Sequence, residues 1–124
     1  MPRDTRQRQA IRDVLDDAGR PLSPPDILKV ARKRVPGLGQ ATVYRTIRAL
    51  VDEGWLVTVE LPGQAPHYER SGLAHHHHFR CRQCERVFEV GGCPGNLKSL
   101  TPPGFRLEGH ELTLYGVCST CASD

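Results

Sequence analysis

The first half of the chain places apolar residues at the spacing of an α-helix. Within residues 4–19, four of them recur at helical intervals: Ala10, Ile11, Val14 and Leu15. This spacing gathers apolar side chains on one face of a helix. Asp4 or Thr5 can cap its start, and Gly19 stands just past its end. The pattern therefore predicts a first helix in this segment.

A second helix is expected within residues 22–37, where the chain carries clear start and stop signals. Ser23 is a good N-cap, and Pro24 and Pro25 suit the first helical turn. Pro36 and Gly37 end the segment. The residues expected on the buried side are Ile27, Leu28, Val30 and Ala31.

Residues 39–56 predict a third helix, which Gly54 ends. The side chains expected to point inward are Val43, Ile47, Leu50 and Val51. Residues 55–70 then show two strand-like runs separated by Pro62-Gly63, which predicts a hairpin. Three helices followed by a hairpin form the order of a winged helix-turn-helix, whose third helix enters the DNA major groove and whose hairpin is the wing.

Basic residues are concentrated in this predicted helical region. The net charge is +3, and 11 of the 17 lysines and arginines lie in residues 1–54. The third helix carries polar side chains that can reach bases, methyl groups and phosphates: Gln40, Thr42, Tyr44, Arg45 and Arg48. We therefore predict double-stranded operator DNA as a partner. The alternatives are a solvated helix surface and, for Tyr44, a core aromatic with an exposed hydroxyl.

The character of the chain changes after Ser71 and Gly72. Short alternating runs indicate a small sheet, and residues 92–100 permit only a short helix. We predict an α+β fold, with a winged-helix DNA-binding domain over residues 1–72 and a small α/β metal-binding lobe over residues 73–124. Two lobes this small bury limited cores, so a structural metal or a dimer interface is expected to stabilise them.

Two Cys-x-x-Cys pairs lie in the second lobe: Cys81, Cys84, Cys118 and Cys121. Two such turns can close a tetrahedral zinc site, and a structural zinc is the interpretation that we favour. The alternatives are a redox pair, a disulfide or chance spacing. Cys93 is left over, either as a small buried residue or as a ligand of another site.

Four consecutive histidines precede the first cysteine pair, and strand alternation divides them. His76 and His78 face one side of a strand, whereas His75 and His77 face the other. His76 and His78 are expected to form a sensing site with Glu69 at the junction of the lobes. His67, two residues before Glu69, is a further candidate ligand of that site. His75 or His77 is expected to form a site with His110 within the second lobe. Cys93 is a further candidate ligand of that site. The alternative is that some of these histidines are surface residues.

The sequence carries no membrane-spanning apolar run and no signal peptide, so a cytoplasmic location and no membrane partner are expected. A zinc hydrolase built on the histidines is a remote alternative, since it needs an open coordination position and a general base. Glu69 can be drawn as that base, but a winged helix then has no role. A zinc-ribbon interaction module leaves the histidines and Tyr44 unexplained. We predict that the protein is not an enzyme and has no small-molecule substrate.

Three motifs together resemble the ferric uptake regulator family: ATVYRTIRALVDEG, HHHHFRCRQC and HELTLYGVCSTC. The similarity spans essentially the whole chain. It implies a winged-helix lobe, a dimerisation lobe, a homodimer and metal-dependent repression of metal-uptake genes. It also implies that Arg8 contacts DNA phosphate and that Tyr44 and Arg45 lie on the recognition helix. The resemblance assigns the structural zinc to the four cysteines, the sensing site to Glu69, His76 and His78, and the second-lobe site to His75, His77 and His110. His67 and Cys93 are added from their positions in this sequence.

Some positions depart from the family pattern. Pro21 stands where iron-type members often have a histidine ligand, and direct counting places Asn96 where an acidic ligand is common. His77 replaces a frequent aspartate. Imidazole and thiolate ligands favour zinc, whereas carboxylates favour iron or manganese. We therefore expect a second, regulatory divalent metal beside the structural Zn²⁺, with Zn²⁺ favoured; an Fe²⁺, Mn²⁺ or peroxide sensor is the alternative.

Overall fold

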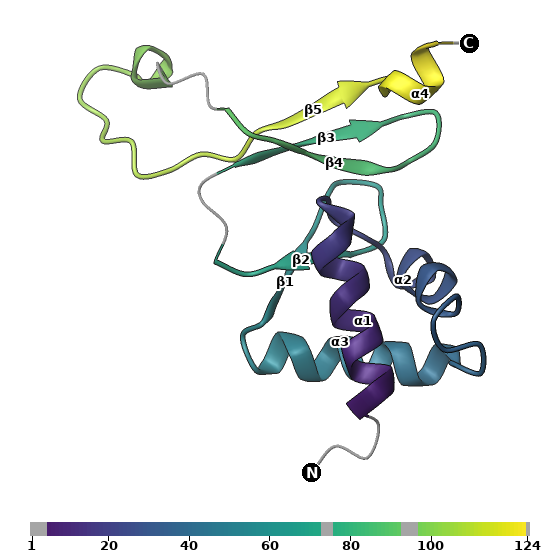
Figure 1. Cartoon of the computed structure of the whole chain (residues 1–124). Helices are drawn as coiled ribbons and strands as arrows, with labels where there is room; N and C mark the ends of the chain where they lie inside the picture. The colour runs from purple at the N-terminus through teal and green to yellow at the C-terminus, as the bar shows by residue number, and fades with distance from the viewer. Residues whose placement is uncertain (1–4, 73–75, 93–96, 124) are drawn as a thin grey trace. The chain divides into compact units, whose positions relative to one another are not determined.

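Three amphipathic helices form most of the N-terminal unit: α1 (Thr5–Ala18), α2 (Pro24–Ala31) and α3 (Gln40–Asp52) (Figure 1). The computed structural model describes residues 5–72, 76–92 and 97–123. In α2, Ser23 accepts a hydrogen bond from the Asp26 backbone N–H, and Asp26 accepts one from the Ser23 N–H. This reciprocal pair is a capping box, and it fixes where the helix begins.

The second helix ends at Ala31, earlier than the predicted stop at Pro36 and Gly37. The N–H groups of Lys33 and Arg34 bond to the carbonyls of Val30 and Ala31, three residues back, at 3.1 and 3.0 Å. These tighter bonds turn the chain out of the helix before Pro36, where the sequence pattern placed the stop.

The hairpin follows α3 as predicted. Strands β1 (Leu56–Val59) and β2 (His67–Arg70) pair antiparallel, with Val57 opposite Glu69. Leu22 adds an isolated antiparallel bridge to Tyr68 on β2. The core of this unit lies among the helices and the start of β1; its buried members are Ile11, Val14, Leu15, Leu22, Ile27, Ala31, Leu38, Val43, Ile47, Leu50 and Leu56.

The C-terminal unit is a three-stranded sheet with little helix. Strands β4 (Val87–Val90), β3 (His77–Cys81) and β5 (Thr113–Gly116) lie in that order. The β3–β4 pair is antiparallel and the β3–β5 pair is parallel. A 3₁₀-helix, η1 (Leu97–Leu100), and a single helical turn, α4 (Ser119–Ala122), complete its described elements.

This sheet has few fully buried apolar side chains. Among the described residues of the unit, those less than a tenth exposed are His77, Cys81, Val87 and Cys118. Two of the four are cysteines, so packing alone gives the unit a small core. The chain clusters into two units, Met1–Leu73 and Ala74–Asp124. Within the described residues, no helix is both long and apolar enough to cross a bilayer.

Candidate metal centres and nucleic-acid interface

The four cysteines of the two Cys-x-x-Cys pairs converge in the C-terminal unit. Cys81 ends β3, and Cys118 is the N-cap of α4. The four sulfur atoms lie within 4.8 Å of one another, and the Sγ atoms of Cys84 and Cys118 are 3.8 Å apart. Sulfurs bound to one tetrahedral zinc at about 2.3 Å stand about 3.8 Å from each other. The predicted four-cysteine cluster is therefore present, with the spacing that zinc requires.

The electrostatics of the cluster favour a cation. The backbone N–H groups of Cys84 and Cys118 each donate to Cys81 Sγ at 3.4 Å. These bonds, that of Cys84 first, lower the pKa of the Cys81 thiol to about 6. Burial, with the neighbouring sulfurs, raises the pKa of Cys121 to about 12. All four groups can be thiolates at neutral pH only when a positive ion compensates their charge, so the donor set fits zinc.

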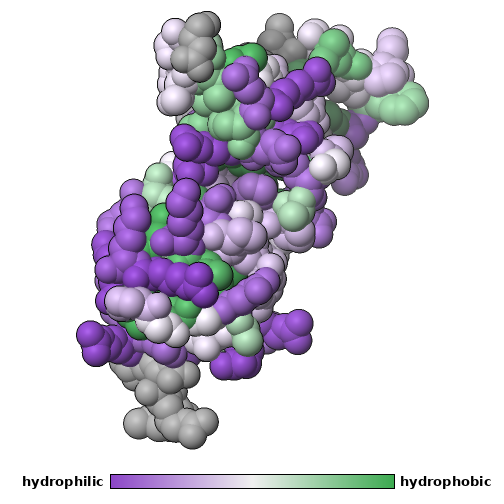
Figure 2. All heavy atoms as spheres, turned by 90° about the vertical axis from the view of Figure 1, so that its right-hand side faces the viewer, coloured by the Kyte–Doolittle hydropathy of each residue, from purple (hydrophilic) through white to green (hydrophobic). Residues whose placement is uncertain are grey.

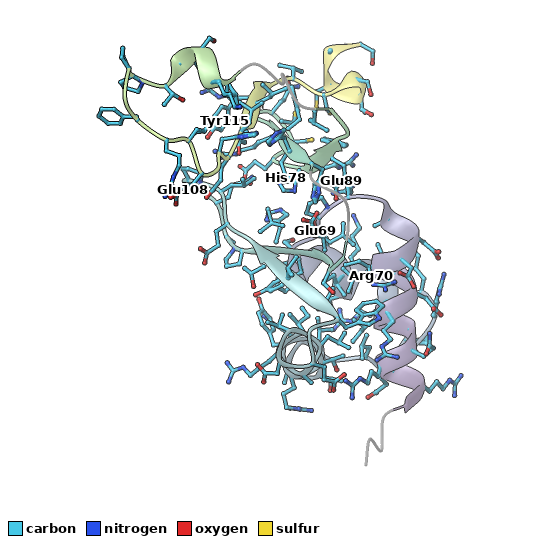
Figure 3. The ribbon with its side chains drawn as sticks, turned by 90° about the vertical axis from the view of Figure 1, so that its left-hand side faces the viewer. Glu69, Arg70, His78, Glu89, Glu108 and Tyr115 are labelled. Atoms are coloured by element: carbon cyan, nitrogen blue, oxygen red, sulfur yellow. The ribbon has the colours of Figure 1, made fainter. Side chains whose placement is uncertain are left out.

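A second group of donors meets on the sheet of the same unit. His78 on β3 lies directly opposite Glu89 on β4, and Figure 3 shows the two side chains near each other. The Nε2 atoms of His76 and His78 are 3.0 and 3.9 Å from Glu89 Oε2. The rings of the two histidines are 4.9 Å apart. Two imidazoles and a carboxylate within this distance can ligate one divalent ion.

His77, the residue between them, takes part in a different pair. Its side chain is 2% exposed, and its Nε2 atom lies 3.2 Å from His110 Nε2. Two nitrogens bound to one tetrahedral zinc at about 2.0–2.1 Å stand about 3.3 Å apart. Among the described histidines of this run, His76 and His78 share one set of neighbours and His77 has another. The division of the run between two metal sites stays a prediction.

Four predicted ligands lie outside the described residues or in the N-terminal unit. His75 and Cys93 lie outside the described residues, so their proposed roles stay predictions. His67 and Glu69 are alternate residues of β2 in the N-terminal unit. The Nδ1 atom of His67 lies 2.9 Å from the Ala65 carbonyl oxygen, which can only accept. Nδ1 therefore donates this bond, and Nε2 is the ring nitrogen that could bind a metal.

Glu89 was missed by the sequence reasoning. Residues 86–90 belong to the short alternating runs that predict a small sheet, but their composition does not show which of them lies opposite His78. The Cys81-x-x-Cys84 turn joins β3 to β4, so the residues pair outward from it, with Arg80 opposite Val87 and His78 opposite Glu89. Counting from the cysteine turn would have found the carboxylate.

The polar side of α3 is exposed, as expected for a helix that binds DNA. Tyr44 is 46% exposed and is therefore not a core aromatic. Gln40, Arg45 and Arg48 are also exposed, and Thr42 is half-buried. Arg45 Nη2 donates to the Thr42 hydroxyl at 3.2 Å. Figure 2 shows hydrophilic side chains over much of one face of the N-terminal unit. Arg8 lies on α1 and pairs with Glu53.

Known proteins with similar sequences and structures are regulators that respond to metals. The model of the ferric uptake regulator family matches residues 2–115. The ferric uptake regulation protein of Synechococcus elongatus is 32% identical over 123 residues, which cover 94% of this chain and 84% of that protein. The zinc uptake regulation protein of Mycobacterium tuberculosis is 32% identical over 124 residues, or 98% of this chain and 95% of that protein. A solved structure of a zinc-bound manganese uptake regulator has a TM-score of 0.81 at 27% identity, and the match covers 94% of this chain and 91% of that one.

The chain belongs to the ferric uptake regulator family. Its members are metal-responsive transcriptional regulators that bind DNA as dimers, and they are not enzymes. The resemblance drawn from the three motifs and the α+β fold class are both confirmed. The hydrolase alternative is excluded by the family.

Proposed function

We propose that the protein is a homodimeric, metal-dependent repressor of metal-uptake genes, with zinc as the metal that it senses. The observation that carries this proposal is the convergence of His76, His78 and Glu89 in a chain that also exposes the polar side of α3. The first feature suits a regulatory ion, and the second suits the DNA major groove.

The proposed sensing ligands are His76, His78 and Glu89, with Glu69 and His67 from β2 as further donors. The support for Glu69 and His67 is their spacing, since alternate strand residues share a face. An ion that binds donors from two units restricts the relative motion of those units and so selects one conformer. In a dimer, this selection would set the separation of the two α3 helices against that of the operator half-sites.

Zinc is preferred because of the second donor pair. His77 and His110 offer two imidazole nitrogens at the separation of a zinc site, and the family motif often has an aspartate in place of His77. His75 and Cys93 are proposed to complete this site. Because it lies within one unit, its ion would stabilise that unit rather than couple it to DNA binding.

Ferrous iron is the second candidate, and Glu89 is the observation that favours it. A carboxylate 3.0 Å from His76 adds an oxygen donor to a site without thiolates. Nitrogen and oxygen donors suit iron and manganese as well as zinc. The sensing site alone therefore does not require zinc.

A DNA-binding titration tests the function and the metal together. Promoter fragments of metal-uptake genes, labelled with a fluorophore, are titrated with protein at buffered free concentrations of Zn²⁺, Fe²⁺ and Mn²⁺ under anaerobic conditions. We expect tight binding at the lowest free concentration with Zn²⁺. Activation by Fe²⁺ alone would replace zinc with the second candidate. Binding that is equal with and without every metal would contradict metal-dependent repression.

A further inference from the structure

Glu53, the C-cap residue of α3, engages two arginines of α1. Arg8 Nη2 pairs with Glu53 Oε2, and Arg12 Nη2 lies 3.9 Å from Glu53 Oε1. Arg8 and Glu53 are 45 positions apart in the chain, so the contact joins two helices rather than neighbouring turns. Figure 1 shows α1 crossing α3 in the N-terminal unit. Arg8, which is expected to contact DNA phosphate, therefore already pairs with the carboxylate of Glu53.

This cluster is partly exposed, and Glu53 is its most exposed member. The side chains of Arg8, Arg12 and Glu53 are 22%, 33% and 48% exposed. Water and salt reach the carboxylate of Glu53 and screen its ion pairs, so these pairs contribute little to stability. Glu53 can therefore change partner at little cost to the fold. Arg12 has a second contact, since its guanidinium lies 5.2 Å from the centre of the Trp55 ring, which holds it in place independently of the carboxylate.

A carboxylate and a DNA phosphate compete for the same guanidinium donors. Both are anions that accept charge-assisted hydrogen bonds from the N–H groups of arginine. Two arginines and one glutamate give this cluster a net charge of +1, and without the glutamate charge it would be +2. Phosphate contacts depend on charge and carry no sequence information. A carboxylate here would thus weaken binding to every DNA sequence alike.

We propose that Glu53 is an intramolecular competitor of DNA phosphate for Arg8, which lowers the affinity of the protein for DNA irrespective of sequence. The proposal rests on the proposed DNA-binding function of α1 and α3. DNA must displace Glu53 before Arg8 can bind phosphate. Contacts from α3 to bases are unaffected, so the affinity for operator and for bulk DNA falls by the same factor and their ratio is unchanged.

The test compares Glu53→Gln with Asp52→Asn in the full-length, zinc-loaded protein. Both variants remove one negative charge at the same end of α3, and Asp52 is the last residue of that helix. The probe is a fluorescein-labelled random-sequence duplex of roughly 30 base pairs, measured by anisotropy over a range of salt concentrations. We expect Glu53→Gln to bind roughly threefold to tenfold more tightly, because no carboxylate has to be displaced from Arg8. The slope of log K against log salt should be steeper by up to about 0.9, because in the wild type the released carboxylate takes up a cation and offsets one counterion released from DNA. Asp52→Asn should give only a small, screened change.

Two further measurements distinguish competition from other roles. In an Arg8→Ala background, the gain from Glu53→Gln should fall to that of Asp52→Asn. The salt concentration at which the protein elutes from a heparin column measures how readily Arg8 binds an anion, without requiring DNA recognition. Glu53→Gln should elute at higher salt than Asp52→Asn. Equal behaviour of the two variants would overturn the proposal. Weaker binding by Glu53→Gln would do so as well, because Glu53 would then position Arg8 for phosphate.

Failure of the proposed function gives a different result. A wild-type protein that binds no promoter fragment with any metal contradicts the regulator function, whereas the comparison on heparin still decides the role of Glu53. Far-UV circular dichroism and the fluorescence of Trp55 check that each variant is folded. Should Glu53→Gln misfold, Glu53→Asp keeps the charge but shortens its reach, and a smaller gain in heparin affinity is then expected; no gain would contradict competition.

Discussion

His76, His77 and His78 are consecutive, yet their imidazoles face two different sets of partners. Glu89 lies 3.0 Å from His76 and 3.9 Å from His78, whereas His110 lies 3.2 Å from His77. A strand turns successive side chains to opposite sides, so one short run can supply two sites. Neighbouring residues of the same type are therefore expected to respond differently to the same substitution.

We predict that His76→Ala abolishes the response of DNA binding to metal, while His77→Ala retains it at a higher metal concentration. Removing His76 deletes a ligand of the proposed sensing site, and removing His77 affects only the pair with His110. The measurement is promoter binding against buffered free Zn²⁺, with size-exclusion chromatography to confirm that both variants stay dimeric. An unresponsive His77→Ala protein would show that the two histidines serve one site.

Arg45→Ala and Tyr44→Ala should weaken operator binding with metal content unchanged. Both side chains are exposed on α3, and a good base contact contributes about 1–3 kcal/mol of discrimination. The loss should be larger on the operator than on a random-sequence duplex of equal length. If both variants bind the operator as wild type does, α3 does not read the sequence.

At the scale of elements, the helices were easier to predict than the sheet contacts. Helix ends depend on local signals such as Ser23 and Gly54, which are visible in the sequence. Glu89 was missed because its partner is set by strand register, which depends on the turn at Cys81–Cys84 and not on the strand's own composition. The early end of α2 was missed because the tight bonds of Lys33 and Arg34 leave no apolar signature.

The capping box of α2 gives a prediction at this scale. Ser23→Ala removes the acceptor for the Asp26 N–H, so the free energy of unfolding of the N-terminal unit should fall by about 0.5–2 kcal/mol. Ser23→Gly is the matched control, since glycine at an N-cap costs only about a few tenths of a kcal/mol. Urea denaturation followed by Trp55 fluorescence measures both. An alanine variant as stable as the glycine variant would mean that the cap adds little.

At the scale of the whole molecule, the two units obtain their stability from different sources. The N-terminal unit buries a continuous apolar cluster drawn from three helices, the segment between α2 and α3, Leu22 and β1. The C-terminal unit buries few apolar side chains among its described residues, and two of its buried residues are cysteines of the proposed zinc site. For a small sheet of this kind, the binding energy of a structural metal is largely folding energy.

Cys81→Ser should therefore release one zinc and unfold the C-terminal unit while the N-terminal unit stays folded. Serine cannot replace a thiolate that backbone N–H groups stabilise, and the unit has little apolar core to compensate. The single tryptophan, Trp55, lies in the N-terminal unit, so its fluorescence reports that unit alone. Zinc content is measured with a colorimetric chelator after denaturation, and the dimer by size-exclusion chromatography. Cys93→Ser, which leaves all four cysteines of the cluster in place, should keep that zinc and the dimer. A Cys81→Ser protein that stays dimeric with its full zinc content would contradict a structural role for the four-cysteine site.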